Sequence, residues 1–163
     1  MKLAILIASV LLAQGALAGE LKIDWVNPEK FTDIAVADQS PASALDIVSK
    51  EFVNIFRRLT KQLPEGYVLE VRVTDLNLAG QIKLNSRGER FRVINESDYP
   101  AISFDYTLMN VDKKVLESDG VDLVDSQFAQ KRRMVSSPYV HEEQMLKAWF
   151  EGAILQKFDL GKK

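Results

Sequence analysis

Carboxylates dominate the side chains of this chain that could do acid–base or metal chemistry. The 163 residues include 23 Asp and Glu, but no Cys and only one His, His141. The lack of cysteine excludes disulfides, thiolate zinc sites and a cysteine nucleophile, and a single histidine excludes a His–His metal pair within one chain. Any chemistry must therefore come from carboxylates, hydroxyls, amines and one imidazole.

Three aspartates are the candidates for a catalytic or metal site: Asp33, Asp75 and Asp105. Asp75 and Asn77 form a D-x-N pattern, and its oxygens could ligate a divalent cation together with those of Asp33 and Asp105. The pattern lacks the glycine and the further acids of an EF-hand loop. Asp75 could instead hold a bend by accepting backbone N–H groups, which is a common role of aspartate. The sequence favours this structural role.

Two further groups of residues have a functional and a structural interpretation. His141 could act as a general base for a nearby serine (Ser136 or Ser137), but a lone histidine in the first turn of an amphipathic helix is typical of the surface. The basic run Lys131-Arg132-Arg133 could bind phosphate, anionic lipid or glycan, although three basic residues beside several acids favour a solvated loop. Three aromatic side chains could line a binding groove or pack in the core or a hinge: Tyr99, Phe128 and Tyr139.

The common enzyme signatures are missing from the sequence. It contains no G-x-S-x-G, no H-E-x-x-H, no G-x-G-x-x-G and no phosphate-cradling glycine loop. We therefore expect no catalytic residue, no metal ligand and no cofactor, and the sequence favours a protein that is not an enzyme.

The first 18 residues, MKLAILIASVLLAQGALA, have the three parts of a secretory signal peptide. Lys2 provides the positive start, residues 3–13 are uncharged and apolar, and residues 16–18 form an A-x-A cleavage signature. A membrane-spanning helix needs about 20 apolar residues, and Gln14 and Gly15 interrupt this run. We expect cleavage after Ala18 and export, most simply to the periplasm of a Gram-negative bacterium. The absence of cysteine excludes a lipoprotein.

Residues 19–163 then form the mature chain, with 20 basic and 23 acidic residues. This balance provides no general attraction to nucleic acid or to anionic membrane. A chain of this length buries enough surface to be stable without disulfides. We expect a single globular domain that does not insert stably into a membrane.

Two amphipathic helices are predicted. The first begins near Ser43 in an S-x-x-D capping pattern with Asp46 and ends before Pro64 and Gly66. Its apolar stripe recurs at spacings of three and four: Val48, Phe52, Ile55, Phe56, Leu59 and Leu63. The second begins near Ser137-Pro138, and its stripe comprises Leu146, Trp149, Phe150, Ala153 and Ile154.

Strand-like alternation marks most of the remaining chain. It occurs in residues 21–25, 69–78, 82–84, 91–93 and 102–108, and a return strand begins at Val115. The alternation slips by one residue at Asp75, which predicts a bulge or bend there. Ala79-Gly80 predicts a close approach of backbone, and residues 85–88 predict a hairpin turn. Together these elements predict an α+β domain in two layers, with an antiparallel sheet and both helices packed on one face.

Several of these segments resemble an uncharacterised family of exported bacterial proteins, the domain of unknown function 3016. The opening PEKFTDI, the Leu63-Pro64 turn and the block TDLNLAG (residues 74–80) carry the resemblance, and weaker likenesses lie at residues 92–93, 99–100 and 123–125. The resemblance implies a single exported domain and assigns no activity. It singles out seven residues of unknown role: Asp33, Pro64, Asp75, Asn77, Gly80, Pro100 and Asp125.

Three hypotheses follow. The first is a non-catalytic binding or accessory module of the cell envelope, whose partner is an envelope protein or a cell-wall component. The second is a hydrolase or a divalent-metal enzyme that uses Asp33, Asp75 and Asp105, with His141 as a participant. The third is an assembly partner that oligomerises through the C-terminal helix and Trp149.

Overall fold

The computed structural model describes residues 19–130 and 138–160. The predicted signal peptide, the basic run at residues 131–133, Ser136 and Ser137 lie outside the described residues.

The main sheet has four strands in the order β1-β2-β5-β6. Their bounds are β1 Glu20–Trp25, β2 Val68–Asn77, β5 Ala101–Met109 and β6 Val115–Val124. β2, β5 and β6 pair in antiparallel fashion, but β1 lies parallel to β2. The sheet is therefore mixed rather than wholly antiparallel, because the helix between β1 and β2 carries the chain back to the end at which β1 began.

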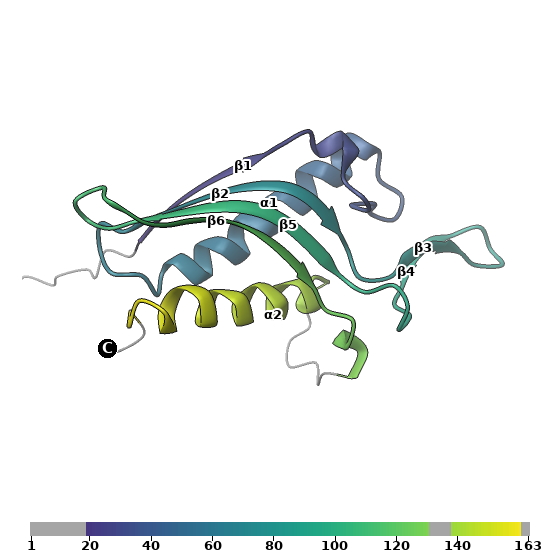
Figure 1. The fold of residues 1–163 in the computed structure, drawn as a ribbon. Coiled ribbons are helices and arrows are strands. Elements are labelled where there is room, and N and C mark those ends of the chain that lie inside the picture. Colours follow the sequence, from purple (N-terminus) through teal and green to yellow (C-terminus); the bar gives the residue numbers. More distant parts are fainter. Residues whose placement is uncertain (1–18, 131–137, 161–163) are drawn as a thin grey trace, which may run out of the picture.

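A second, two-stranded sheet forms a hairpin that stands away from the main body (Figure 1). Its strands are β3 Gln81–Leu84 and β4 Arg90–Val93, joined by the turn that residues 85–88 predicted. Gly88 lies in this turn with a φ of 78°, a backbone conformation that favours glycine. We call residues 81–93 the arm.

Both helices cover the same face of the main sheet (Figure 1). α1 spans Pro41–Thr60, and α2 spans Val140–Trp149 and continues as a π-helix, η3, over Phe150–Gln156. A short 3-10 turn, η1, covers Pro28–Lys30, and another, η2, covers Phe128–Gln130. The α+β architecture with helices on one face is as the sequence predicted.

α1 begins earlier than the S-x-x-D pattern suggested. Ser40, rather than Ser43, is the N-cap, and its side-chain oxygen accepts a hydrogen bond of 3.2 Å from the backbone N–H of Ser43. Pro41 occupies the first turn, where its missing N–H has no helical partner to lose. Ser40 therefore begins the helix because its own backbone is extended, whereas Ser43 already lies inside the helix.

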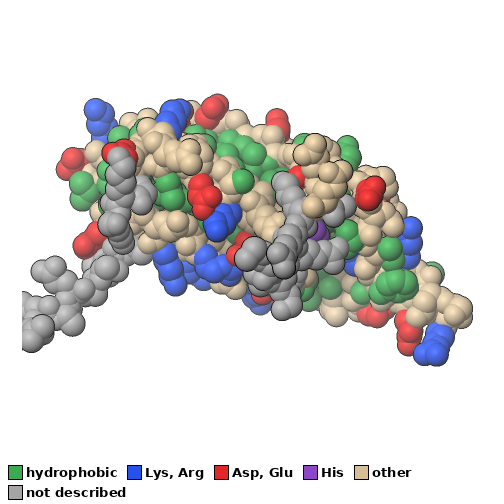
Figure 2. Space-filling model, turned by 90° about the horizontal axis from the view of Figure 1, so that it is seen from below, with side chains coloured by type: hydrophobic (Ala, Val, Ile, Leu, Met, Phe, Trp, Pro, Cys, Tyr) green, Lys and Arg blue, Asp and Glu red, His purple; other side chains and the backbone are tan. Residues whose placement is uncertain are grey.

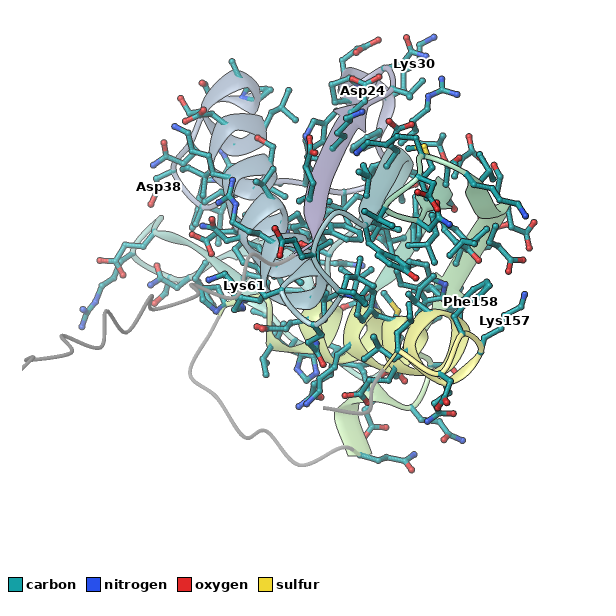
Figure 3. All side chains as sticks on the ribbon, turned by 90° about the vertical axis from the view of Figure 1, so that its left-hand side faces the viewer. Asp24, Lys30, Asp38, Lys61, Lys157 and Phe158 are labelled. Carbon is teal, nitrogen blue, oxygen red and sulfur yellow. The ribbon has the colours of Figure 1, made fainter. Side chains whose placement is uncertain are left out.

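The core lies between the sheet and the helices. Phe56 of α1 packs edge-on against Phe104 of β5, with ring centroids 5.9 Å apart, and Phe104 packs against Trp149 of α2 at 4.8 Å. Near the end of the C-terminal helix, Lys157 Nζ lies 2.5 Å from Glu117 Oε2 of β6, and Figure 3 labels Lys157 beside Phe158. Aromatic packing and this ion pair hold the C-terminal helix on the sheet.

The opposite face of the sheet is polar. Lys22 pairs with Glu70 at 2.8 Å, Arg72 lies 3.9 Å from Asp105, and the hydroxyls of Thr107 and Ser118 are 3.0 Å apart. Successive side chains of a strand point to opposite faces, so the apolar residues that alternate with these face the helices. Within the described part of the chain, no helix is long and apolar enough to cross a membrane.

The two irregularities predicted in residues 73–80 are present. The register of β2 against β5 shifts between Val73 and Asp75, which is the expected bulge. Gly80 has a φ of 80°, and a Cβ atom there would clash with the backbone oxygen of Val93. Both features redirect the chain as it leaves the main sheet for the arm.

The stripe of α1 provides a direct test of this packing. Phe52 is fully buried in the core, so Phe52→Ala should lower the free energy of unfolding by about 3–5 kcal/mol. Urea denaturation measures the loss, and Glu51→Ala on the exposed side of the same helix should change it by less than about 0.5 kcal/mol. A loss below about 1 kcal/mol for Phe52→Ala would mean that another face of α1 is buried.

Candidate functional site

Asp33 lies at the meeting point of three segments: the loop before α1, the end of β2 and the base of the arm. Its backbone forms a parallel bridge with Asn77, in which the Asp33 N–H donates to the Leu76 carbonyl (3.0 Å) and the Leu78 N–H donates to the Asp33 carbonyl (2.9 Å). We call this region, residues 31–36 with residues 75–80 and the base of the arm, the junction.

Arg92 of β4 connects the three segments of the junction. Its Nη1 donates to Asp33 Oδ2 (3.0 Å), to the Gly80 carbonyl (2.7 Å) and, at longer range, to the Ala79 carbonyl (3.3 Å). Its Nη2 donates to the Ala35 carbonyl at 2.6 Å. The Asp33 and Arg92 side chains are only 25% and 19% exposed. A guanidinium suits this position because it presents several donors in a fixed plane. We call this set of contacts the Arg92 clamp.

Asp75 is also engaged within the junction. Its Oδ1 accepts the backbone N–H of Thr32 and its Oδ2 accepts the Thr32 hydroxyl, both at 2.7 Å. The bulge in β2 places the carboxylate next to the loop. Asp75 therefore makes the kind of backbone contact that the structural interpretation of the sequence describes.

The remaining motif residues continue this network, with one exception. The Asn77 side-chain amide donates to the Tyr99 carbonyl at 3.2 Å, and the Gly80 N–H donates to the Asp98 carbonyl at 2.8 Å. The Asp125 N–H donates to the Pro100 carbonyl at 3.1 Å, and its Oδ1 accepts the Gln127 N–H. The exception is Pro64, whose carbonyl accepts the Tyr67 N–H in the turn after α1.

The three aspartates of the enzyme hypothesis do not share one site. Asp105 lies in the middle of β5 on the polar face of the sheet, near Arg72. Asp33 and Asp75 lie at the junction, and each carboxylate is occupied by its own donors. Among the described residues, no group of three or more His, Asp or Glu side chains could hold a metal ion.

His141 is buried, contrary to the surface position expected from the sequence. It is 4% exposed, and its ring packs edge-on against Phe128 with centroids 4.8 Å apart. The reason is that the first turn of α2 packs against η2, so this turn faces the protein and not water. Phe128 is fully buried and Tyr139 nearly so, which leaves Tyr99 as the exposed aromatic of the three.

Glu142 is a candidate that the sequence interpretation missed. It is 1% exposed, and its Oε1 accepts the backbone N–H of Ala79 at 2.7 Å, which ties α2 to the junction. Its Oε2 has no hydrogen-bond partner among the described residues. Burial raises the pKa of this carboxyl, and the Ala79 hydrogen bond and the nearby Arg92 only partly oppose the shift. In the sequence, Glu142 lies one helical turn before Leu146 and therefore on the apolar stripe, a position that indicates burial.

Three hollows surround the junction. The largest, of about 610 Å³, lies between the loop at residues 28–39 and the start of α1. A second, of about 340 Å³, is polar and lies on the other side of Asp33, against Asp98 and Tyr99. The third, of about 190 Å³, is lined by Glu142, Tyr139 and Arg92 together with mainly apolar residues. Asp33 lines the first two, so the segment around Asp33, which the Arg92 clamp holds, forms the wall between them.

The large cavity is mainly apolar. We call it the α1 cavity, and its apolar lining comprises Pro28, Phe31, Ile34, Ala35, Val36, Pro41, Ala42, Ala44 and Leu45. Its polar groups are few, and they include Arg90, which the arm contributes. An apolar hollow with a few polar groups is the usual form of a small-molecule binding site, and its volume lies within the usual range of about 300–1,000 Å³.

The raised pKa of Glu142 predicts a pH dependence of stability. A carboxyl whose pKa is raised on folding contributes stability that is fully present below its unfolded pKa of about 4.3, and that is lost as the pH rises through the folded pKa. Glu142→Gln keeps the shape and an acceptor for the Ala79 N–H, so it should lose less stability than the wild type over this rise. Urea denaturation from about pH 4 to about pH 8 measures the difference. Glu151→Gln, at a side chain that is 45% exposed on the C-terminal helix, is the control. Equal pH profiles for wild type and Glu142→Gln would refute the assignment.

Comparison with known proteins identifies a family for the chain. No curated protein matches the chain. A family model, described as "Protein of unknown function (DUF3016)", matches residues 19–152, which cover both helices, both sheets and the whole junction. The match begins at the residue after the predicted cleavage site. The chain therefore belongs to the DUF3016 family, to which no biochemical role is assigned.

Proposed function

We propose that the protein is an exported, periplasmic binding module without catalytic activity, and that it holds an apolar component of the cell envelope in the α1 cavity. The observation that carries the proposal is the cavity itself, about 610 Å³ of mainly apolar surface beside the junction. An apolar ligand bound there removes apolar surface from water, which favours binding by roughly 25 cal/mol for each Å² buried.

The clamped loop supports this use of the cavity. One wall is residues 31–36, which Asp75 holds through Thr32 and which Arg92 holds through Asp33 and Ala35. The other wall is the first turn of the 20-residue helix α1. Both walls are fixed by hydrogen bonds, and a preformed site binds with a smaller loss of conformational entropy than one that must be ordered.

The occupied carboxylates support the absence of catalysis. A general acid or base must reach the proton that it transfers. Asp33 and Asp75 accept hydrogen bonds from the protein's own backbone or side chains, and Asp105 lies on the polar face of the sheet beside Arg72. The proposal therefore assigns the motif aspartates to holding the walls of the cavity.

An apolar fluorescent probe tests the cavity. Phenylnaphthylamine should bind residues 19–163, and Ala42→Trp should weaken its affinity about tenfold or more, because the indole fills space that Ala42 lines. The matched control is Ser43→Trp, which adds the same side chain at the neighbouring exposed residue outside the cavity.

A fluorescence titration measures both affinities, and thermal melts check that both variants fold. Equal probe affinity in the two variants would show that the α1 cavity is not the binding site. The proposal requires that Ser43→Trp binds the probe as the wild type does and that Ala42→Trp binds it about tenfold more weakly or worse.

Export is tested separately by the mass of the protein recovered from the periplasm. A signal peptide at residues 1–18 predicts a mature protein that begins at Gly19. Leu6→Arg places a charge in the apolar run and should leave the uncleaved chain in the cytoplasm, whereas Leu6→Val should be processed normally. Full-length wild-type protein in the cytoplasmic fraction would overturn the export proposal.

A further inference from the structure

The arm is a projecting hairpin on which basic and large apolar side chains are exposed together. The β5–β6 turn also exposes Val111 and Val115 beside Lys113 and Lys114, but the arm has the larger excess of basic residues. It has four basic residues and one acidic residue, whereas the rest of residues 19–163 has 16 basic and 22 acidic residues. The arm thus has a net charge of +3 on a body of −6. The overall balance near neutrality conceals this separation, which the fold creates by extending residues 81–93 away from the main sheet (Figure 1).

Three of the four cations on the arm are free. Arg92 is held in the clamp, but Lys83, Arg87 and Arg90 are exposed and form no ion pair with any described residue. The single acid of the arm, Glu89, is tied to the Asn85 side chain, which donates to Glu89 Oε2 at 2.6 Å. The Asn85 amide is neutral, so Glu89 keeps its charge, and the three cations with Glu89 leave the arm with a net charge of +2 outside the clamp.

Two large apolar side chains accompany these cations. Leu84 is 68% exposed and Phe91 is 44% exposed. In the hairpin register Lys83 is opposite Phe91, and Leu84 is opposite Arg90. Cross-strand partners point to the same face of a hairpin, and successive residues point to opposite faces. Each face of the arm thus presents one apolar side chain beside one cation.

The base of the arm is fixed although its end projects. Arg92 joins it to Asp33 and Ala35, and the Gln81 side chain donates to Asp98 Oδ1 at 2.8 Å. Asp98 is itself held by the Asn95 side-chain amide at 2.8 Å. The arm is therefore a supported projection, and at the right-hand end of Figure 2 it shows hydrophobic, basic and acidic side chains at the surface.

We propose that the arm is a docking element for a bilayer that contains anionic phospholipids. Basic side chains meet the lipid phosphates, while Leu84 and Phe91 enter the boundary between headgroups and acyl chains. A fluid headgroup layer satisfies both faces of the hairpin at once, whereas a rigid protein surface contacts one face and leaves the apolar group of the other in water. The acidic body is repelled by the same lipids, so the molecule docks by its arm.

Vesicle co-sedimentation tests the proposal with residues 19–163, which contain every described residue. Vesicles of equal parts phosphatidylglycerol and phosphatidylcholine should bind the wild type, and vesicles of phosphatidylcholine alone should bind it much more weakly. The arm variant Lys83→Gln, Arg87→Gln, Arg90→Gln should lose about a hundredfold in affinity, or about fivefold for each cation removed. The matched control is Lys30→Gln, Lys61→Gln, Lys114→Gln.

The control removes the same total charge from exposed positions outside the arm, two of which Figure 3 labels. It should change the affinity by less than about fivefold. A second variant, Leu84→Ser with Phe91→Ser, should abolish the binding that remains at high salt, because screening removes the electrostatic part alone. All these side chains are exposed, and thermal melts confirm that each variant is folded.

Two results would overturn the proposal. One is a wild type that stays in solution with anionic vesicles, the outcome expected if the arm binds an acidic protein instead. The other is an equal loss of affinity in the arm variant and in its control, which would mean that total charge alone decides binding. Arg90 also lines the α1 cavity, whereas Leu84 and Phe91 do not, so a loss of vesicle binding in Leu84→Ser with Phe91→Ser separates docking by the arm from binding in the cavity.

Discussion

The ion pair between Arg92 and Asp33 is the interaction on which the arrangement of this protein depends. One guanidinium holds a side chain and three backbone carbonyls from segments that are far apart in the sequence. Carbonyl oxygens at the ends of strands need partners when they are shielded from water, and unpaired ones cost about 1–3 kcal/mol each. Arg92 supplies those partners, and in doing so it fixes the loop before α1, the exit of β2 and the base of the arm relative to one another.

This constraint explains why many of the family-motif residues lie close together although they do not resemble a catalytic or metal site. Asp33 anchors Arg92, Asp75 holds Thr32, and Gly80 makes room for the backbone of β4. Their combined effect is geometric: on one side they form a wall of the α1 cavity, and on the other they support the arm. Two functions are thus proposed for the surroundings of the junction, a cavity that takes an apolar molecule and an arm that meets anionic lipid. Arg90, which belongs to the arm and also lines the cavity, connects them.

The features that could be predicted from the sequence were those with a local cause. The stripe of α1, the alternation of β5, the hairpin turn and the slip at Asp75 each arise from the period of one element and the steric preference of a few residues. The parallel pairing of β1 and β2 and the Arg92 clamp depend on contacts between distant residues, such as Asp33 and Arg92, which are 59 positions apart. His141 was misjudged and Glu142 was missed because polar residues in a first helical turn are usually exposed, whereas this turn packs against η2 and Ala79.

A double-mutant cycle on Asp33→Asn and Arg92→Met measures the central claim most directly. If the two side chains act together as a structural clamp, the free energies of unfolding of the two single variants and the double variant should show a coupling of about 1–3 kcal/mol. The single variants should each be clearly destabilised, since each leaves a half-buried partner without its counter-charge. Additive effects within about 0.5 kcal/mol, or an Asp33→Asn variant as stable as the wild type, would contradict the account. Asp33 would then not act as a structural clamp.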